Sequence, residues 1–283
     1  MTTAALAIDR PVREPSTWSA PRFDPRLYQI ATLTGLLSYG LLWLRFDVRP
    51  LQVLVILATA LGTQYVCGRR AGLGFDPKSA LISALSLCLL LRTNVTALAA
   101  AAAVMAVGSK FVIRVRGKHV FNPTNVAIVA LIAATGQVWV SPGQWGNVAF
   151  FGFLMACLGG LVVNRAARSD VTYAFLAFYL ALVFGRSLWL GEPMAIPIHR
   201  LENGALLLFA FFMISDPKTT PDTRAGRVLF AALVAFGGWY VQFRLFRTNG
   251  LLWSLVLFSP LVPWIDRMWP GARYAWTSAR SST

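Results

Sequence analysis

The sequence predicts an all-α integral membrane protein with about ten transmembrane helices. Hydrophobic residues make up 57% of the 283 residues, and the mean hydropathy is +0.60. Charged residues make up only 13%, against about a quarter in a typical soluble domain. Apolar runs of about 15–20 residues recur along the whole chain, and helices of this length cross, or nearly cross, a hydrocarbon layer about 30 Å thick.

Glycine, proline and charged residues interrupt the apolar runs and mark the expected ends of the helices. We expect helices at about 27–44, 51–67, 79–91, 96–115, 124–137, 148–164, 171–186, 203–215, 227–243 and 250–266. The chain then divides into three parts. These are a flexible cytoplasmic arm over residues 1–25, a transmembrane domain over residues 26–267, and a cytoplasmic tail over residues 268–283.

The distribution of cations predicts the orientation of the helices. With the N-terminus inside, 19 of the 26 Lys and Arg residues fall on the inner side and 7 on the outer side. Cytoplasmic loops of membrane proteins carry such an excess. We therefore expect a multi-pass protein of a bacterial-type inner (plasma) membrane, with both termini cytoplasmic. Topology accounts for the net charge of +15, so we expect no nucleic-acid partner. The uncharged outer loop 137–147 carries Trp139 and Trp145, as interfacial aromatic belts do.

Two of the expected helices, 79–91 and 203–215, are unusually short. Each holds the third place in one half of the chain, and each half has five helices. Because five is an odd number, the second half must have the opposite topology to the first. Paired short helices in opposed halves are typical of inverted repeats with broken helices at a central site. We expect repeats at about 26–137 and 148–267.

Two polar stretches adjoin these apolar runs and are candidates for a binding site. The first, RVRGKHVFNPTN at 114–125, places Asn122 as an N-cap and Pro123 in the first turn of a helix. Free N–H groups at such a helix start attract anionic or carbonyl groups. The second, SDPKTTPDTRAGR at 215–227, follows the second short helix. A capped helix start with topogenic charges and a solvated hairpin explain the same residues equally well.

Several kinds of site are missing from the sequence. It has no GxSxG elbow, HExxH pair or Walker P-loop. His119 and His199 fall on opposite sides of the predicted membrane, so they do not share a haem. The three cysteines show no CxxC spacing, and we expect no metal site. No residue can be named as catalytic.

Three segments resemble a known family. They are GKHVFNPTN at 117–125, MISDPKTTPDTRAGR at 213–227 and NGLLWSLVLFSPLVPWID at 249–266. These segments are similar to parts of the B subunit of the sodium-pumping NADH:quinone oxidoreductase and of the D subunit of the Rnf electron-transport complex. The resemblance extends from about Asp24 to Asp266, and the chain looks like a shorter, divergent relative.

The resemblance implies a ten-helix inverted-repeat fold that holds flavin in the membrane and passes electrons between partner redox subunits. The chain would then be an electron-transfer component and not a self-contained enzyme. Many members carry FMN esterified to a threonine in a Ser-Gly-Ala-Thr-type motif, which this sequence lacks. We therefore expect FMN or riboflavin to bind non-covalently. The expected contacts come from the two polar stretches and are Lys118, His119, Asn122, Thr124, Asn125, Asp216, Lys218, Thr219, Thr220 and Arg224.

Two other functions remain open at this point. Inverted repeats with broken helices also suit alternating access, so the chain could carry a flavin or another small anionic molecule across the membrane. A fold that has lost its cofactor could serve as a non-redox structural subunit. All three readings place the chain in a lipid bilayer.

Overall fold

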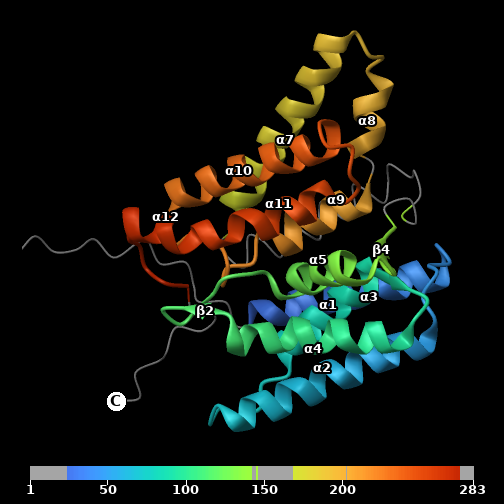
Figure 1. Ribbon diagram of the computed structural model, residues 1–283, viewed down its shortest axis with the longest axis vertical. Helices are drawn as coiled ribbons and strands as arrows, with labels where there is room; N and C mark the ends of the chain where they lie inside the picture. Colours follow the sequence, from blue (N-terminus) through green and yellow to red (C-terminus); the bar gives the residue numbers. More distant parts are fainter. Residues whose placement is uncertain (1–23, 142–144, 146–167, 202, 275–283) are drawn as a thin grey trace, which may run out of the picture.

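The computed structural model describes residues 24–141, 145, 168–201 and 203–274. These residues are mostly helical, and most of the long helices lie roughly alongside one another (Figure 1). The expected helix at 148–164 lies outside the described residues. So do almost all of the expected N-terminal arm and the last nine residues of the expected tail.

The first half contains five helices close to their expected positions. They are α1 (Pro25–Leu42), α2 (Pro50–Arg70), α3 (Lys78–Leu90), α4 (Thr96–Val112) and α5 (Pro123–Thr135). Helix α3 contacts α1, α2, α4 and α5, and every residue from Ser83 to Leu90 is buried. The short helix is thus the centre of this half. Its neighbours shield it, so it need not meet lipid along its length.

The second half repeats much of this order in a more interrupted form. It contains α7 (Ser169–Leu190), α8 (Ala195–Leu201), α9 (Gly204–Leu208), α10 (Arg224–Phe243), α11 (Gly250–Phe258) and α12 (Val262–Met268). Helix α9 continues directly into a π-helical turn, η2 (Phe209–Met213), and a 3₁₀ turn, η3 (Ser259–Leu261), joins α11 to α12. Helix α10 packs against α7 and α11, and α11 also contacts α5, which joins the two halves.

The protein is mostly helical, as expected, but short antiparallel strand pairs occur in two places. Strand β1 (Leu91–Thr93) pairs with β4 (Val138–Val140). Strand β2 (Arg114–Val115) pairs with β3 (Lys118–His119). The β2–β3 turn uses left-handed backbone at Arg116 (φ 51°) and Gly117 (φ 80°). Helix α4 therefore ends at Val112 and not at residue 115, because the backbone turns into β2.

Two expectations at the opposite end of the helices are also wrong. No helix is expected between those at 171–186 and 203–215, but α8 lies there. Trp145 was expected at the membrane interface, but it is only 1% exposed. Its ring meets Phe46 edge-on, with centroids 4.8 Å apart, and fills the space left by Gly204, where a Cβ would lie 2.5 Å from the indole. Trp139 is 38% exposed, and its interfacial position stays a prediction.

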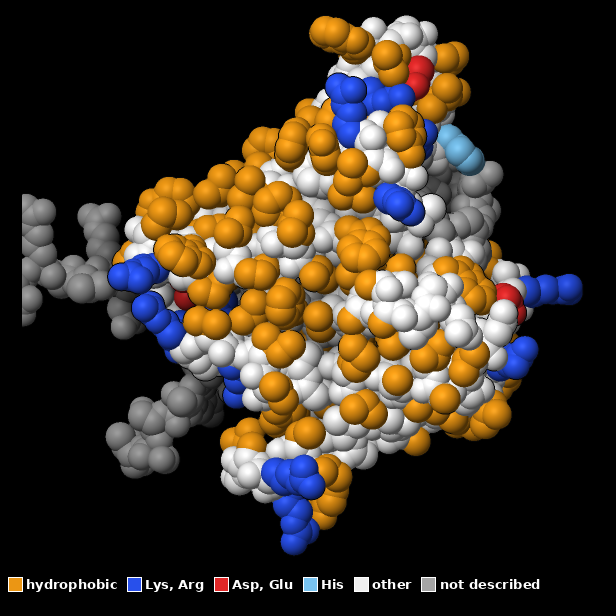
Figure 2. All heavy atoms as spheres, in the orientation of Figure 1, with side chains coloured by type: hydrophobic (Ala, Val, Ile, Leu, Met, Phe, Trp, Pro, Cys, Tyr) orange, Lys and Arg blue, Asp and Glu red, His pale blue; other side chains and the backbone are white. Residues whose placement is uncertain are grey.

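Four of the described helical segments are long and apolar enough to cross a membrane. They are Pro50–Arg70, Ser169–Leu190, Arg224–Phe243 and Gly250–Met268. Shorter apolar helices cover Lys78–Leu90, Thr96–Val112, Pro123–Thr135 and Gly204–Met213. Figure 2 shows hydrophobic side chains spread over the middle of one face, with Lys and Arg gathered near its ends. The described chain is thus a multi-pass helical membrane protein, and the count of ten crossings stays a prediction.

Candidate functional site

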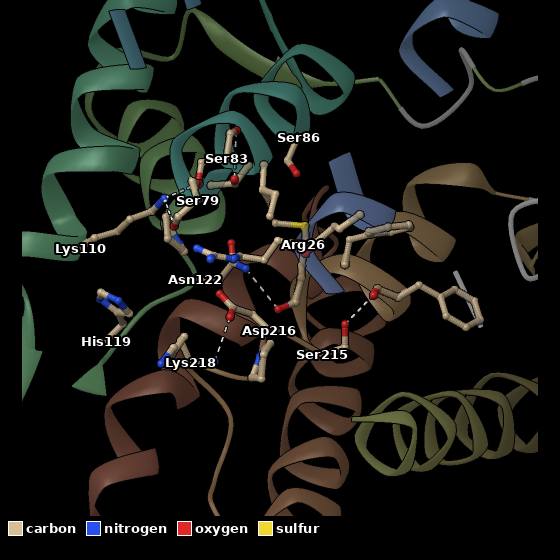
Figure 3. Close-up of a pocket in the computed structure, with 18 residues that line it drawn as sticks. Arg26, Ser79, Ser83, Ser86, Lys110, His119, Asn122, Ser215, Asp216 and Lys218 are labelled. Atoms are coloured by element: carbon tan, nitrogen blue, oxygen red, sulfur yellow. Dashed lines mark hydrogen bonds between the residues drawn. The ribbon is translucent and has the colours of Figure 1, made fainter. Parts of the chain in front are cut away.

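A small polar cavity of about 70 Å³ lies where the two halves meet. Figure 3 shows its side chains converging from α1, α3, α4, the start of α5 and the segment after η2. We call it the inner cavity, because it lies at the end of the molecule predicted to face the cytoplasm. Its polar side chains are Arg26, Gln29, Ser79, Ser83, Ser86, Lys110, His119, Asn122, Thr124, Ser215, Asp216 and Lys218.

A row of serines lines one wall of the inner cavity. Ser79, Ser83 and Ser86 follow one another at spacings of four and three on α3, so they share a helix face. The Ser83 hydroxyl donates to the carbonyl oxygen of Ser79 at 3.2 Å. Neither the 114–125 stretch nor the 215–227 stretch includes this face. The spacing of the three serines within an apolar helix was the signal that could have revealed it.

Lys110 is a second cavity residue that the sequence did not single out. It is only 6% exposed, and its Nζ donates to the carbonyl oxygen of Ser79 at 2.7 Å and to the Ser79 hydroxyl at 3.0 Å. From the sequence it was expected only as an inner-side cation. Instead it ties the last turn of α4 to the first turn of α3 and brings a positive charge to the cavity wall (Figure 3).

The Asn-Pro-Thr-Asn cluster caps α5 and holds helices together. Asn122 Oδ1 accepts the backbone N–H of Asn125 at 3.0 Å, which confirms the predicted N-cap. Asn122 Nδ2 donates to the carbonyl oxygen of Met213, at the end of η2, at 3.2 Å. Asn125 Nδ2 donates to the carbonyl oxygen of Leu252 in α11 at 3.1 Å. The Thr124 hydroxyl donates to the carbonyl oxygen of Ser83 at 3.3 Å. These side chains already have protein partners.

Asp216 and His119 face the inner cavity with altered acidity. Burial raises the pKa of Asp216, opposed by a 3.0 Å hydrogen bond from the backbone N–H of Lys218 and by the cations of Lys110 and Lys218. Burial, together with the cations of Arg114, Lys110 and Lys218, lowers the pKa of His119 from 6.5 to about 4. His119 is therefore neutral at pH 7 and adds no positive charge there.

The structure brings five of the ten expected site residues to the inner cavity: His119, Asn122, Thr124, Asp216 and Lys218. The other five do not line it. Lys118 Nζ donates to Asp222 at 2.9 Å and to Asp266 at 2.7 Å. Asn125 is bound to α11, the Thr219 hydroxyl donates to the carbonyl oxygen of Asp216 at 3.3 Å, and Thr220 is fully buried. Arg224 is exposed at the start of α10.

A larger pocket of about 720 Å³ opens at the opposite end of the molecule. We call it the outer pocket. Helices α7 and α9, the turn between α10 and α11, and β4 surround it. Aromatic side chains line it at Trp139, Tyr179, Phe209 and Phe246, and polar or cationic ones at His199, Arg200, Asn203, Gln242, Arg247, Thr248 and Asn249. No acidic residue lines it among those described.

The polar groups of the outer pocket come from segments far apart in the sequence. The Tyr179 hydroxyl contacts Gln242 Oε1 at 2.9 Å and so joins α7 to α10. The Arg200 guanidinium lies 4.8 Å from the ring centroid of Phe243. Arg247 is exposed and makes no ion pair within the described part of the chain. Met213 lines both the outer pocket and the inner cavity, so the end of η2 separates the two spaces.

Comparison with known proteins identifies a matching family and several relatives. Residues 134–274 match the model of the NQR2, RnfD, RnfE family. The D subunit of an ion-translocating oxidoreductase complex from Erwinia tasmaniensis is 34% identical over 150 residues, which cover 51% of this chain and 37% of the relative. The D subunits of such complexes from Cronobacter sakazakii and Pectobacterium carotovorum are 30% and 33% identical, over 53% and 44% of this chain.

These matches confirm the resemblance to this family that the sequence segments indicated. The matched regions cover 37%, 41% and 34% of the three relatives, so the chain spans well under two thirds of their length. The family match includes η2, α10, α11 and α12. It also includes most of the residues that line the outer pocket.

Proposed function

We propose that this chain is a membrane subunit of an electron-transport complex and that it binds a flavin without a covalent bond in the outer pocket. The similarity to subunits of ion-translocating oxidoreductase complexes supports the membrane-subunit role and partner redox subunits. The volume of the outer pocket is the observation that supports a flavin site there. At about 720 Å³ it falls within the range of about 300–1,000 Å³ that is usual for small-molecule sites.

The inner cavity fits a flavin less well, although the sequence pointed to its residues. Its volume of about 70 Å³ is below what even a small ligand needs. Asn122, Asn125 and Lys118 already bond to protein partners. A flavin there would have to break these bonds and separate the two halves of the molecule. We therefore favour the outer pocket for the ring system.

The side chains around the outer pocket suit the parts of a flavin mononucleotide. Arg200 and Arg247 would bind the phosphate, because charge-assisted hydrogen bonds to phosphate are among the strongest available to a protein. The amides of Asn203 and Gln242 both donate and accept, as the polar edge of the ring requires. Phe209 provides a buried apolar wall. When bound, the flavin supplies the electron-transfer chemistry, and the protein supplies orientation and electrostatics.

The inverted repeat belongs to the same proposal. In the first half α2 packs against α4, and α4 against α5. In the second half α7 packs against α10, and α10 against α11. The central short element is α3 in one half and α9–η2 in the other. This parallel in packing order supports two five-helix repeats of opposite topology, with a binding site where they meet.

Purification of the full chain in detergent tests the flavin proposal. We expect flavin absorbance, and acid precipitation should leave the flavin in the supernatant. Replacing the outer-pocket cation by Arg247→Gln should weaken FMN binding about tenfold, as the loss of one hydrogen bond to a charged group does. The same variant should leave riboflavin binding unchanged, since riboflavin has no phosphate.

Lys218→Gln is the matched control in the inner cavity and should not change flavin affinity. If Lys218→Gln weakens FMN binding while Arg247→Gln does not, the flavin belongs at the inner site. If the purified chain shows no flavin and gains none on addition of FMN or riboflavin, the chain is better explained as a structural subunit.

A carrier of flavin or of another small anion is the second candidate function. The position of Met213 favours it, because this residue alone lines both the inner cavity and the outer pocket within the described chain. A shift of η2 could then expose one space or the other, as alternating access requires. Saturable uptake of FMN by proteoliposomes would support the carrier. Saturable binding without uptake would support the electron-transfer role.

A further inference from the structure

A groove runs along the exposed side of the second half, between the N-terminal parts of α7 and α10. It consists of two adjoining hollows of about 570 and 590 Å³ that share Arg224 and Val228. The first hollow is partly polar and is lined by Ser169, Asp170, Tyr173 and Ala174 of α7. The second is apolar and is lined by Phe178 of α7 and by Ala225, Leu229 and Ala232 of α10. The groove therefore changes from polar to apolar along its length.

Small and large side chains alternate along the apolar part. Ala225 and Ala232 are seven residues apart on α10, so they lie on the same face two turns apart. Both have small side chains, and the larger Phe178 and Leu229, which also line the hollow, are 40% and 36% exposed. The groove lies on α10, which is long and apolar enough to span a membrane, so there it would face lipid.

The charges at the polar end leave one cation without an acidic partner in the part of the chain that the structure describes. Arg227 Nε donates to both carboxylate oxygens of Asp170, at 2.8 and 3.0 Å, and its Nη1 donates to the carbonyl oxygen of Asp222 at 2.7 Å. Asp170 is thereby neutralised. The Arg224 side chain makes no hydrogen bond or ion pair with any residue that the structure describes. It is also the first residue of the 20-residue apolar helix α10, which places it at the membrane boundary.

We propose that this groove binds an anionic phospholipid. The phosphate would meet Arg224 and the exposed Tyr173 at the polar end, and an acyl chain would lie over Ala232 between Phe178 and Leu229. Complementarity of charge and shape supports this occupant. The Arg224 cation would lie at the depth of the lipid headgroups, next to the apolar hollow. A phospholipid has a negatively charged phosphate followed by an apolar acyl chain, in the same order. Long cationic side chains at helix ends commonly reach the headgroup region in this way.

Native mass spectrometry of the full chain, released from detergent with added phosphatidylglycerol or phosphatidylcholine, tests this proposal. The wild-type chain should retain phosphatidylglycerol in preference to phosphatidylcholine. Arg224→Gln should weaken phosphatidylglycerol retention about fivefold, which corresponds to about 1 kcal/mol for one cation near an anionic surface. Arg70→Gln is the matched control. It removes an exposed cation from the end of α2, away from the groove, and should change nothing.

Ala232→Trp supplies a second test, because it fills the apolar hollow and leaves Arg224 in place. It should reduce retention of both lipids, provided that the variant elutes as a single species with the wild-type helical content. Equal phosphatidylglycerol retention by wild type, Arg224→Gln and Ala232→Trp would overturn the proposal. A photo-crosslinker at Leu229 that captures a protein partner instead of lipid in native membranes would also overturn it, since the groove would then be a protein interface.

Discussion

Lys118 links the two halves of the molecule through a single ammonium group. Its Nζ lies between Asp222 and Asp266, and the backbone N–H of Asp222 donates to Asp266 at 2.8 Å. The three side chains are 14%, 8% and 16% exposed, so the group is largely shielded from water. Strand β3 of the first half is thereby held against the inner end of α12.

Replacing this cation should expose the repulsion between the two carboxylates. We expect Lys118→Met to lower the free energy of unfolding by about 2 kcal/mol, somewhat less than the ~3–5 kcal/mol for breaking a fully buried pair. Thermal denaturation of the detergent-purified protein measures the effect as a lower midpoint. Lys118→Met combined with Asp266→Asn should recover part of the loss, because one carboxylate charge is removed. Arg70→Met, at an exposed position, is the control, and an equal loss there would contradict the prediction.

Asp24 at the start of α1 predicts a dependence of stability on pH. Burial disfavours its charge, but hydrogen bonds from Arg26 and Lys78 outweigh burial and lower the pKa of Asp24 from 3.8 to about 2. A lowered carboxylate pKa stabilises the folded state above the unfolded pKa, and this stabilisation is lost as the pH falls towards the folded value. Asp24→Asn should therefore lower the melting temperature at pH 6.

The difference between wild type and Asp24→Asn should shrink between pH 4 and about 2, the window set by the two pKa values. Melting temperatures measured in one detergent at several pH values test this. Asp47→Asn, at a residue without an ion pair among those described, should show no such pattern. A difference for Asp24→Asn that stays constant down to the lowest pH would mean that the ion pair does not account for it.

Some site residues could be predicted from local sequence and others could not. Asn122 was predictable because Asn-Pro before an apolar run fixes an N-cap within one turn. The cavity-facing positions of Lys110 and Ser79 depend on a bond between α3 and α4, which are 31 residues apart at that point. No local sequence pattern indicates that Lys110 and Ser79 lie together. Lys118 was expected to contact a ligand. Its partners are instead two aspartates that lie 104 and 148 residues away, too far along the chain for local sequence to indicate them.

At the scale of elements, the turn between α10 and α11 depends on glycines. A Cβ on Gly250 would lie 2.6 Å from the carbonyl oxygen of Gly238 and 3.3 Å from the backbone nitrogen of Gln242. Backbone atoms cannot move aside as a flexible side chain can. The close approach of α10 and α11 thus requires glycine at residue 250, where the chain also borders the outer pocket.

Gly250→Ala should separate α10 from α11 and destabilise the protein by about 1–3 kcal/mol, the usual cost of overpacking. Size-exclusion chromatography after heating the detergent-purified protein to a series of temperatures gives the midpoint of this loss. Gly185→Ala in α7 is the matched control, since no atom lies within 4 Å of the added Cβ. That control should be neutral or slightly stabilising, because alanine favours helix over glycine. Equal midpoints for the two variants would show that the close approach does not require glycine.

The positions of the described helices could be predicted from apolar runs, but their interruptions could not. The run over 203–215 contains no proline or charge that would mark the change from α9 to the π-helical η2. Helix α8 was missed because Pro193 and Pro197 indicate a loop, although Pro197 lies in the first turn of that helix, where proline is tolerated. The strand pair β1–β4 joins residues almost 50 positions apart, and its short strands carry no alternating pattern of their own.

For the whole molecule, the two ends of the helices carry different charge. The β2–β3 turn, the end of α2 and the start of α10 lie at one end, and the α10–α11 turn lies at the other (Figure 1). The segments assigned to the side of the first end carry 19 of the 26 Lys and Arg residues of the sequence. Bacterial membrane proteins retain cation-rich loops in the cytoplasm. The first end should therefore be cytoplasmic, and the outer pocket should open towards the opposite side of the membrane.

Single-cysteine labelling tests this orientation directly. In a background with Cys67, Cys88 and Cys157 replaced by alanine, Arg116→Cys marks the β2–β3 turn and Leu245→Cys marks the α10–α11 turn. Both positions are exposed, so an impermeant maleimide reaches them without unfolding the protein. Arg116→Cys should react in inverted vesicles and not in spheroplasts, and Leu245→Cys should do the reverse. The opposite pattern would place the outer pocket on the cytoplasmic side. Labelling of both positions from one side would contradict the arrangement of α10 across the membrane, and with it the inverted relation of the two halves.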